Sequence, residues 1–148
     1  MSVQPQYAAV PAIGFCQISA ANTNRDGTGT LGTLVVGRAP GTRVDKVMFR
    51  ATGTTTAGIL RIYHAVNGLT LNADGTIASF SAPTKRLIAE ISVAAYTPSG
   101  TQKAFGSAVA AEGDWTPPAD LVLGQYEALY VSTHNAETFN AFAIGGHL

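Results

Sequence analysis

The chain of 148 residues carries little charge of either sign. Charged residues make up 12% of the sequence, and nine basic residues against nine acidic ones leave a formal net charge of zero. Proteins that bind nucleic acid neutralise its phosphates with clustered lysine and arginine side chains. We therefore do not expect nucleic acid as a partner.

Cysteine is almost absent, since Cys16 is the single cysteine of the sequence. It has no partner for a disulfide within the chain, and it lies in the apolar stretch GFCQIS. A free cysteine in such surroundings is usually a small buried side chain. The chain needs no disulfide to fold, because a domain of about 150 residues buries roughly 70% of its unfolded surface.

Long apolar runs are missing too, so no membrane-spanning segment and no membrane partner are expected. The first residues, MSVQPQYAAVPAIGF, lack the basic start and continuous apolar core of a signal peptide, which predicts synthesis and assembly in a cytoplasm. Prolines at positions 5 and 11 interrupt this segment, which we interpret as an extended arm of residues 1–14. Apolar residues on the arm favour docking on its own domain or on a neighbour: Tyr7, Val10 and Ile13.

Residues 15–148 predict a single all-β domain, a jelly-roll or related antiparallel β-sandwich. Runs of β-branched and aromatic residues recur at short intervals between turn signals such as NRDG, VNGL and NADG. In residues 43–51 apolar and polar residues alternate, as in a half-buried strand. We predict nine strands, at residues 15–20, 31–36, 43–51, 59–66, 85–93, 103–108, 120–123, 126–133 and 139–144.

No catalytic or metal-binding pattern occurs in the sequence. His64, His134 and His147 show no HxH or HxxxH spacing, and there is no second cysteine to complete a zinc site. We interpret His64 as a polar contact at the rim of the sheet or between strands. The serine motif GxSxG is absent, and the glycine-rich residues 27–33 lack the lysine of a phosphate-binding loop. We expect no enzyme, no catalytic residue, no metal and no cofactor.

The last stretch, STHNAETFNAFAIGGHL, places His134 three residues before Glu137. On a helix the two side chains would share one face, where a metal or a proton-transfer pair can form. The surrounding pattern instead ends one strand at His134 and begins the next at Phe139, with NAET as the turn. This interpretation removes the helical geometry on which such a site depends.

Carbohydrate binding is the alternative that the aromatic residues leave open. β-Sandwich modules bind sugars on exposed aromatic platforms, and Trp115, Tyr126 and Tyr130 are candidates for one. In YEALYVST, alternation places Tyr126, Ala128 and Tyr130 on one side of the predicted strand, with the tyrosines as a ladder. Such ladders also occur in cores and in subunit interfaces.

Three stretches resemble, in order and spacing, a family of small structural proteins of tailed bacteriophages: GILRIYHAVNG, KRLIAEISVAAYTPSGTQKAF and ADLVLGQYEALYVSTHNAETFNAFAIGGHL. The resemblance covers residues 30–148 and is most specific in STHNAETFNAFAIGG. Within this family the chain looks like the capsid decoration, or cement, proteins of short-tailed phages. An acidic residue often follows the terminal Gly-Gly of that pattern, whereas this sequence has His147.

The resemblance implies a non-enzymatic virion protein, made in the host bacterial cytoplasm and located on the capsid exterior. Such proteins are jelly-roll or related β-sandwiches, usually homotrimers, that tie neighbouring subunits of the major capsid protein together. A phage tail protein, a head fibre or a carbohydrate-binding module used in host attachment is the alternative. We expect the partner contacts to come from Tyr7, Val10, Ile13, Trp115, Tyr126 and Tyr130.

Overall fold

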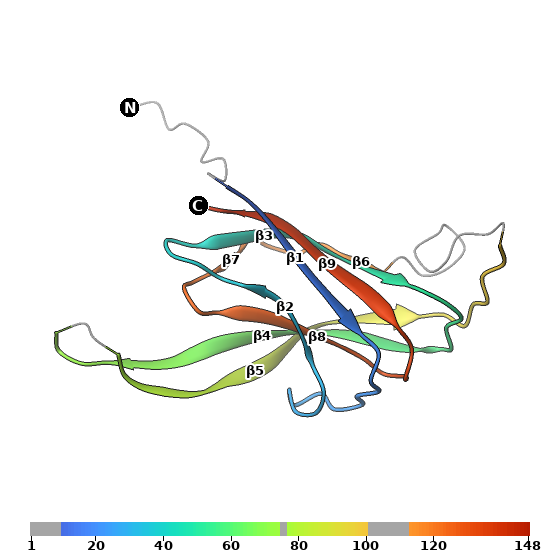
Figure 1. The fold of residues 1–148 in the computed structure, drawn as a ribbon, viewed down its shortest axis with the longest axis horizontal. Coiled ribbons are helices and arrows are strands. Elements are labelled where there is room, and N and C mark those ends of the chain that lie inside the picture. The colour runs from blue at the N-terminus through green and yellow to red at the C-terminus, as the bar shows by residue number, and fades with distance from the viewer. Residues whose placement is uncertain (1–9, 75–76, 101–112) are drawn as a thin grey trace.

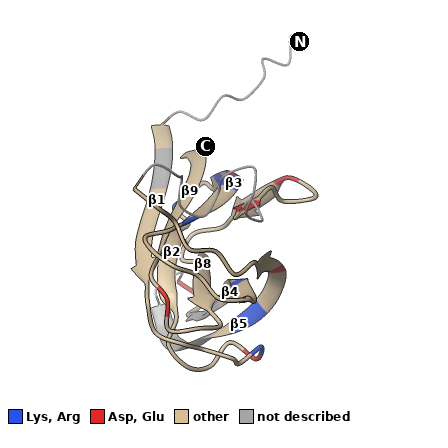
Figure 2. Cartoon of the chain, turned by 90° about the vertical axis from the view of Figure 1, so that its right-hand side faces the viewer, with Lys and Arg blue, Asp and Glu red and all other residues tan. Residues whose placement is uncertain are grey.

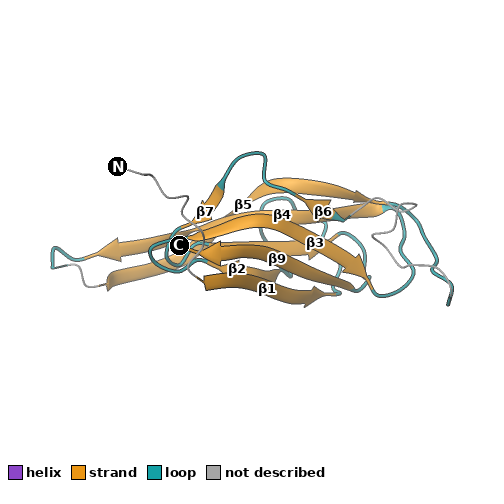
Figure 3. Ribbon diagram, turned by 90° about the horizontal axis from the view of Figure 1, so that it is seen from above, coloured by secondary structure: helices purple, strands orange, loops and turns teal. Residues whose placement is uncertain are grey.

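The computed structural model describes residues 10–74, 77–100 and 113–148, with the backbone alone for some strand residues. Two antiparallel sheets pack face to face in it (Figure 1). All described regular elements are strands, as Figure 3 shows from above. The prediction of an all-β sandwich is therefore confirmed.

The strand order of the first sheet is β1-β9-β3-β6, and β7 also pairs with β3. The order of the second sheet is β2-β8-β4-β5. The strands of the first sheet are β1 (Val10–Ile18), β3 (Thr42–Ala51), β6 (Asp114–Trp115), β7 (Leu121–Leu123) and β9 (Phe139–His147). Those of the second sheet are β2 (Gly32–Val36), β4 (Gly58–Leu71), β5 (Ile77–Val93) and β8 (Ala128–Thr133).

The core lies between the two sheets and follows the alternation of the strands. In β3, Val47, Phe49 and Ala51 are buried while the residues between them are partly exposed, as the sequence predicts. In β9 the alternating residues Phe139 and Ala141 are buried in the same way. The second sheet completes the core with Leu34, Leu60, Ile62, Leu129 and Val131.

Several predicted strand limits were wrong. β1 begins at Val10, five residues before the predicted strand, and residues 10–14 of the predicted arm pair with β9. Pro11 is tolerated there because β1 is an edge strand, where a missing N–H removes no interior hydrogen bond.

The predicted turn at VNGL is also wrong, because β4 runs on to Leu71 and pairs with β5, with a register shift at Asn67. The short strand β6 was not predicted, and residues 1–9 and 103–108 lie outside the described residues.

The loop of residues 19–31, between β1 and β2, folds across the outer face of the second sheet. Gly27 and Gly29 both have φ of 81°, a conformation that glycine adopts without steric cost. The Asp26 carboxylate accepts hydrogen bonds from the Thr28 backbone N–H at 3.0 Å and hydroxyl at 2.6 Å. A Cβ on Gly27 would lie 2.6 Å from the Lys85 Cβ, so the loop rests directly on β5.

Candidate functional site

The turn after β8 is the place where the sequence raises the question of a catalytic pair. β8 ends at Thr133 and β9 begins at Phe139, so the predicted turn is confirmed. The Glu137 carboxylate accepts hydrogen bonds from the Thr56 backbone N–H at 2.7 Å and hydroxyl at 2.5 Å. His134 faces Arg61 instead, with 3.5 Å between Nδ1 and the guanidinium. Glu137 and His134 therefore contact different residues and do not form a catalytic pair.

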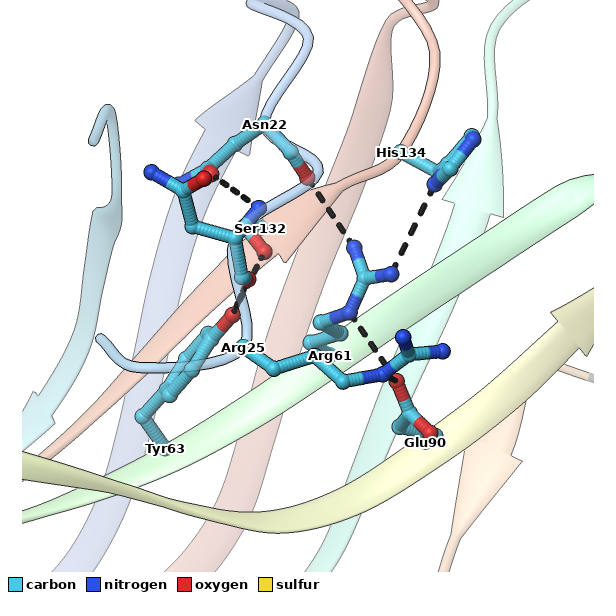
Figure 4. Close-up of polar contacts among 8 residues, drawn as sticks. Asn22, Arg25, Arg61, Tyr63, Glu90, Ser132 and His134 are labelled. Atoms are coloured by element: carbon cyan, nitrogen blue, oxygen red, sulfur yellow. Dashed lines mark hydrogen bonds and ion pairs between the residues drawn. The ribbon is translucent and has the colours of Figure 1, made fainter. Parts of the chain in front are cut away.

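Arg61 is the centre of a buried polar cluster on the outer face of the second sheet (Figure 4). Its side chain is only 1% exposed. Nε donates to the Glu90 carboxylate at 3.0 Å, and one terminal nitrogen donates to the Asn22 carbonyl oxygen at 3.0 Å. The other terminal nitrogen meets Nδ1 of His134. Each of the three guanidinium nitrogens therefore has a partner among the described residues, and the side chain is covered rather than presented to a ligand.

The same cluster holds the loop of residues 19–31 in place. Tyr63 follows Arg61 by two residues in β4. Its hydroxyl donates a hydrogen bond to the Asn24 carbonyl oxygen at 2.6 Å. The Asn22 side chain donates to the carbonyl oxygens of Thr28 and Thr30, each at 2.9 Å. The backbone N–H of Asn22 donates to Thr133 at the end of β8. Hydrogen bonds to β4 and to β8 therefore hold the loop against the second sheet.

Glu90 joins the buried Arg61 to the exposed Arg25, which lies at 2.8 Å from the same carboxylate oxygen. The hydrogen bond from Arg25, followed by the one from Arg61, holds the pKa of the Glu90 carboxyl below its usual range. Glu90 thus remains ionised at neutral pH and balances the buried guanidinium. The chemistry of this cluster is that of a structural clamp.

The cluster around Arg61 was not predicted from the sequence. A signal for it exists, because Arg61 stands between Leu60 and Ile62 in an otherwise apolar strand, a position where an arginine is costly unless it is paired. The predicted polar contact of His64 is confirmed, since its Nε2 lies 3.2 Å from the Glu127 carboxylate. No group of three or more His, Cys, Asp or Glu side chains that could hold a metal ion occurs within the described ranges.

The outer face of the first sheet exposes a row of apolar side chains. The register places Phe15 of β1, Phe142 of β9 and Met48 of β3 side by side across three strands. The rings of Phe15 and Phe142 lie with centroids 5.2 Å apart. Ile144 extends the row along β9 and is 43% exposed. We call these four residues the outer apolar row; such rows on a protein surface mark contact sites for other macromolecules.

Polar and charged groups border the outer apolar row. On one side the Gln17 amide donates to the Asn140 side-chain oxygen at 3.0 Å. On the other, Asp114 of β6 pairs with Lys46 at 2.7 Å and with Arg50 at 2.6 Å. The hydrogen bond from Arg50, with that from Lys46, lowers the pKa of the Asp114 carboxyl. An apolar centre with a polar rim is the usual anatomy of a protein–protein contact.

The predicted contact residues do not gather into one site. Val10 is exposed at the start of β1, Ile13 is paired in register with Ile144, and Tyr7 lies outside the described residues. Trp115 of β6 packs partly against the core. Tyr130 is half-buried in β8, with the Lys85 ammonium 5.0 Å from its ring centre.

The predicted ladder of Tyr126 and Tyr130 is wrong. Tyr126 lies in the turn before β8 with a φ of 68° and is 43% exposed, so it is not on the strand that carries Tyr130. The physical reason is a tight turn at residues 124–127, closed by the hydrogen bond from the Glu127 N–H to the Gly124 carbonyl oxygen.

Cys16 is half-buried and packs against the core, in line with the expectation of a small apolar side chain. Burial raises the pKa of its thiol to about 11. Because the thiolate is the nucleophilic form, this cysteine is almost unreactive at neutral pH.

Comparison with known proteins found no matching family model, no matching curated protein and no matching solved structure. In the part of the chain that the structure describes, no helix is long and apolar enough to cross a membrane. Figure 2 shows the charged residues as short, scattered segments on a mostly uncharged ribbon, without a continuous basic stripe over the described residues.

Proposed function

We propose that this protein is a non-enzymatic structural protein of a tailed-phage virion, a decoration protein that binds the major capsid protein on the outside of the head. The sequence resemblance, strongest in STHNAETFNAFAIGG, supports the phage family. The outer apolar row carries the proposal of a capsid contact, because it is an exposed apolar centre with a polar rim. In this proposal the protein is made in the bacterial cytoplasm, forms homotrimers, and uses neither membrane nor nucleic acid as a partner.

The arrangement of the strands supports the same proposal. The two short strands β6 and β7 both pair with β3 antiparallel, at different parts of its length. Counted as one interrupted strand, they leave eight strands in two sheets of four, the number that a jelly roll has. We therefore propose the jelly roll as the specific form of this sandwich.

Decoration would work through many modest contacts on an assembled shell. A subunit that touches two neighbouring capsid subunits binds the second at a high effective concentration, so two weak contacts add up to firm attachment. A protein that binds the assembled shell and not the free subunits stabilises the shell by mass action. Neither step needs catalytic chemistry.

Substituting Ile144 by aspartate should lower the number of copies bound per shell by about tenfold or more at subsaturating concentration, because a charge is placed in the apolar centre of the contact. Val66→Asp is the matched control, since Val66 of the other sheet is 43% exposed, as Ile144 is. Binding is measured by cosedimentation with purified undecorated shells, and circular dichroism checks that both variants fold. Equal binding by wild type and Ile144→Asp would rule out this face as the capsid contact.

The number of copies per virion separates decoration from the tail and head-fibre alternatives. A decoration protein is present in a fixed, high ratio to the major capsid protein, whereas a tail or fibre protein is present in a few copies. Quantitative mass spectrometry of purified virions measures this ratio. A ratio typical of tail components would overturn the decoration proposal and leave the phage assignment intact.

A carbohydrate-binding function for host attachment is supported by one observation, a groove of about 230 Å³ beside Trp115. The groove combines this aromatic residue with the exposed Asp120, and its other lining residues are Ile88, Pro117, Pro118, Ala119 and Leu121. If sugars bind here, Trp115→Ala and Asp120→Ala should both abolish signals on a glycan array. Because Trp115 also packs against the core, Asp120→Ala is the decisive variant. An array without signal for the wild type would exclude this alternative for the sugars tested.

A further inference from the structure

A groove of about 610 Å³ lies where the two sheets meet along their edge strands β1 and β2. The two strands touch at Gly14, where a Cβ would clash with the Leu34 carbonyl oxygen. Val10 at 55% and Val36 at 47% exposure are large apolar residues of its walls. Its lining residues are Val10, Pro11, Gly14, Phe15, Leu34, Val35, Val36, Arg38 and His147. The volume lies within the range of about 300–1,000 Å³ in which proteins bury small ligands, enough for a few residues of extended chain.

Hydrogen-bond donors stand among the apolar walls of this groove. The Thr42 hydroxyl accepts the Arg38 backbone N–H at 3.0 Å and lies 2.8 Å from Nδ1 of His147. When the Thr42 hydroxyl donates this hydrogen bond to Nδ1, the neutral imidazole of His147 carries its own proton on Nε2. The Arg38 guanidinium forms no ion pair with another described residue. The groove therefore suits a chain with an apolar side and with hydrogen-bond acceptors.

The sequence that precedes β1 has this character. Val3, Pro5 and Tyr7 alternate with Gln4 and Gln6, which is the period of a strand with one apolar face. Residues 1–9 contain no charged side chain, and the two glutamine side chains supply amide oxygens that accept hydrogen bonds. Proline is compatible with an edge strand, where its missing N–H faces away from the sheet.

We propose that residues 1–9 of a second copy of this chain occupy the groove between β1 and β2. The chain enters β1 at Val10, which itself lines the groove. To reach the groove of its own copy, the segment would have to reverse within Tyr7-Ala8-Ala9, which contains none of the glycine, asparagine, aspartate or proline residues that favour tight turns. Extended, nine residues span up to about 30 Å, far enough to reach a neighbour.

The contact joins two different surfaces, an arm and a groove, so successive copies form a ring where the rotation between them closes. A ring of three would supply the subunit contact of the proposed homotrimer. The proposal nevertheless concerns this chain alone, and its test contains no capsid. Its failure would leave capsid binding through the outer apolar row untouched, and a failure of capsid binding would leave the arm contact untouched.

Val36→Asp in the full-length chain should weaken self-association by about tenfold or more, because it places a charge in the apolar wall of the groove. Val122→Asp is the matched control, since Val122 of β7 is 45% exposed at a position outside the groove. Light scattering coupled to size exclusion, over a series of concentrations, measures the mass of each protein against the 15.3 kDa of one chain. A wild type that is monomeric at its highest soluble concentration, or equal association by Val36→Asp, would overturn the proposal.

A photo-crosslink identifies the occupant directly. Tyr7→p-benzoylphenylalanine keeps an aromatic side chain in the arm and adds a group that bonds to its neighbours under light. A mixture of isotope-labelled and unlabelled chains should give crosslinks between one labelled and one unlabelled chain, at residues that line the groove. Crosslinks confined to a single chain, or crosslinks between chains at other surfaces, would contradict the proposal.

Discussion

Replacing Arg61 with alanine should lower the free energy of unfolding by about 2–5 kcal/mol, the range typical of truncating a large buried side chain. The side chain is 1% exposed and donates to Glu90 and to the Asn22 carbonyl oxygen. Its removal leaves a cavity and takes the hydrogen-bond partner from that buried carbonyl oxygen. Urea unfolding, followed by circular dichroism, measures the change.

Arg25→Ala is the matched control for Arg61→Ala. Arg25 contacts the same carboxylate oxygen of Glu90, but its side chain is 60% exposed, so its loss should cost no more than about 1 kcal/mol. Arg61→Met retains most of the buried volume and should fall between the two variants, because only the polar contacts are lost. A change for Arg61→Ala as small as that for Arg25→Ala would show that the cluster does not hold the loop.

Gly145→Ala should destabilise the sandwich by about 3 kcal/mol or more, or prevent folding, because the added methyl group has no room. A Cβ at this position would overlap the backbone carbonyl oxygen of Arg43 in the neighbouring strand β3. A backbone atom within a sheet cannot rotate away as the end of a side chain can. The register between β3 and β9 also shifts directly beside this point, between Val44 and Lys46.

Gly53→Ala is the control for this substitution, since nothing lies within 4 Å of a Cβ built at Gly53. It should leave the free energy of unfolding unchanged within about 0.5 kcal/mol. Thermal and urea unfolding of both variants measure the difference. If Gly145→Ala were as stable as Gly53→Ala, the strands β3 and β9 would have to lie farther apart than the structure places them.

The close packing at Gly145 and the burial of Arg61 differ in how far they could be predicted from the sequence. Gly145 lies one residue beyond the predicted strand of residues 139–144, in the part of β9 that was not predicted. Nothing in the sequence indicates that the carbonyl oxygen of another strand lies against it. Arg61 lies on the opposite face of its strand from Leu60 and Ile62, as the alternation of the strand and its register with β8 show. Its burial was missed, because that outer face is covered by a loop some forty residues earlier in the chain.

The surface residues of the last strand and of the predicted tyrosine ladder were likewise only partly predictable from the sequence. In residues 139–144 the sequence places aromatic or aliphatic side chains on both faces of the last strand. The structure then separated them, with Phe139 and Ala141 in the core and Ile144 in the outer apolar row. The tyrosine ladder failed at Tyr126 because a turn with a left-handed residue ends the strand pattern early, and sequence alternation does not register such a turn.

By itself the sequence determined the class of fold, the alternating faces of the strands, the turn between His134 and Phe139, and the scarcity of charge and cysteine. These properties follow from short-range patterns, since the period of side chains along a strand and the preferences of turn residues act over a few positions. Only the tertiary structure decided which faces are covered, which edges meet to form the groove, and that Arg61 is buried. Those outcomes depend on contacts between residues far apart in the chain, and local periodicity carries no information on which segment will cover a given face.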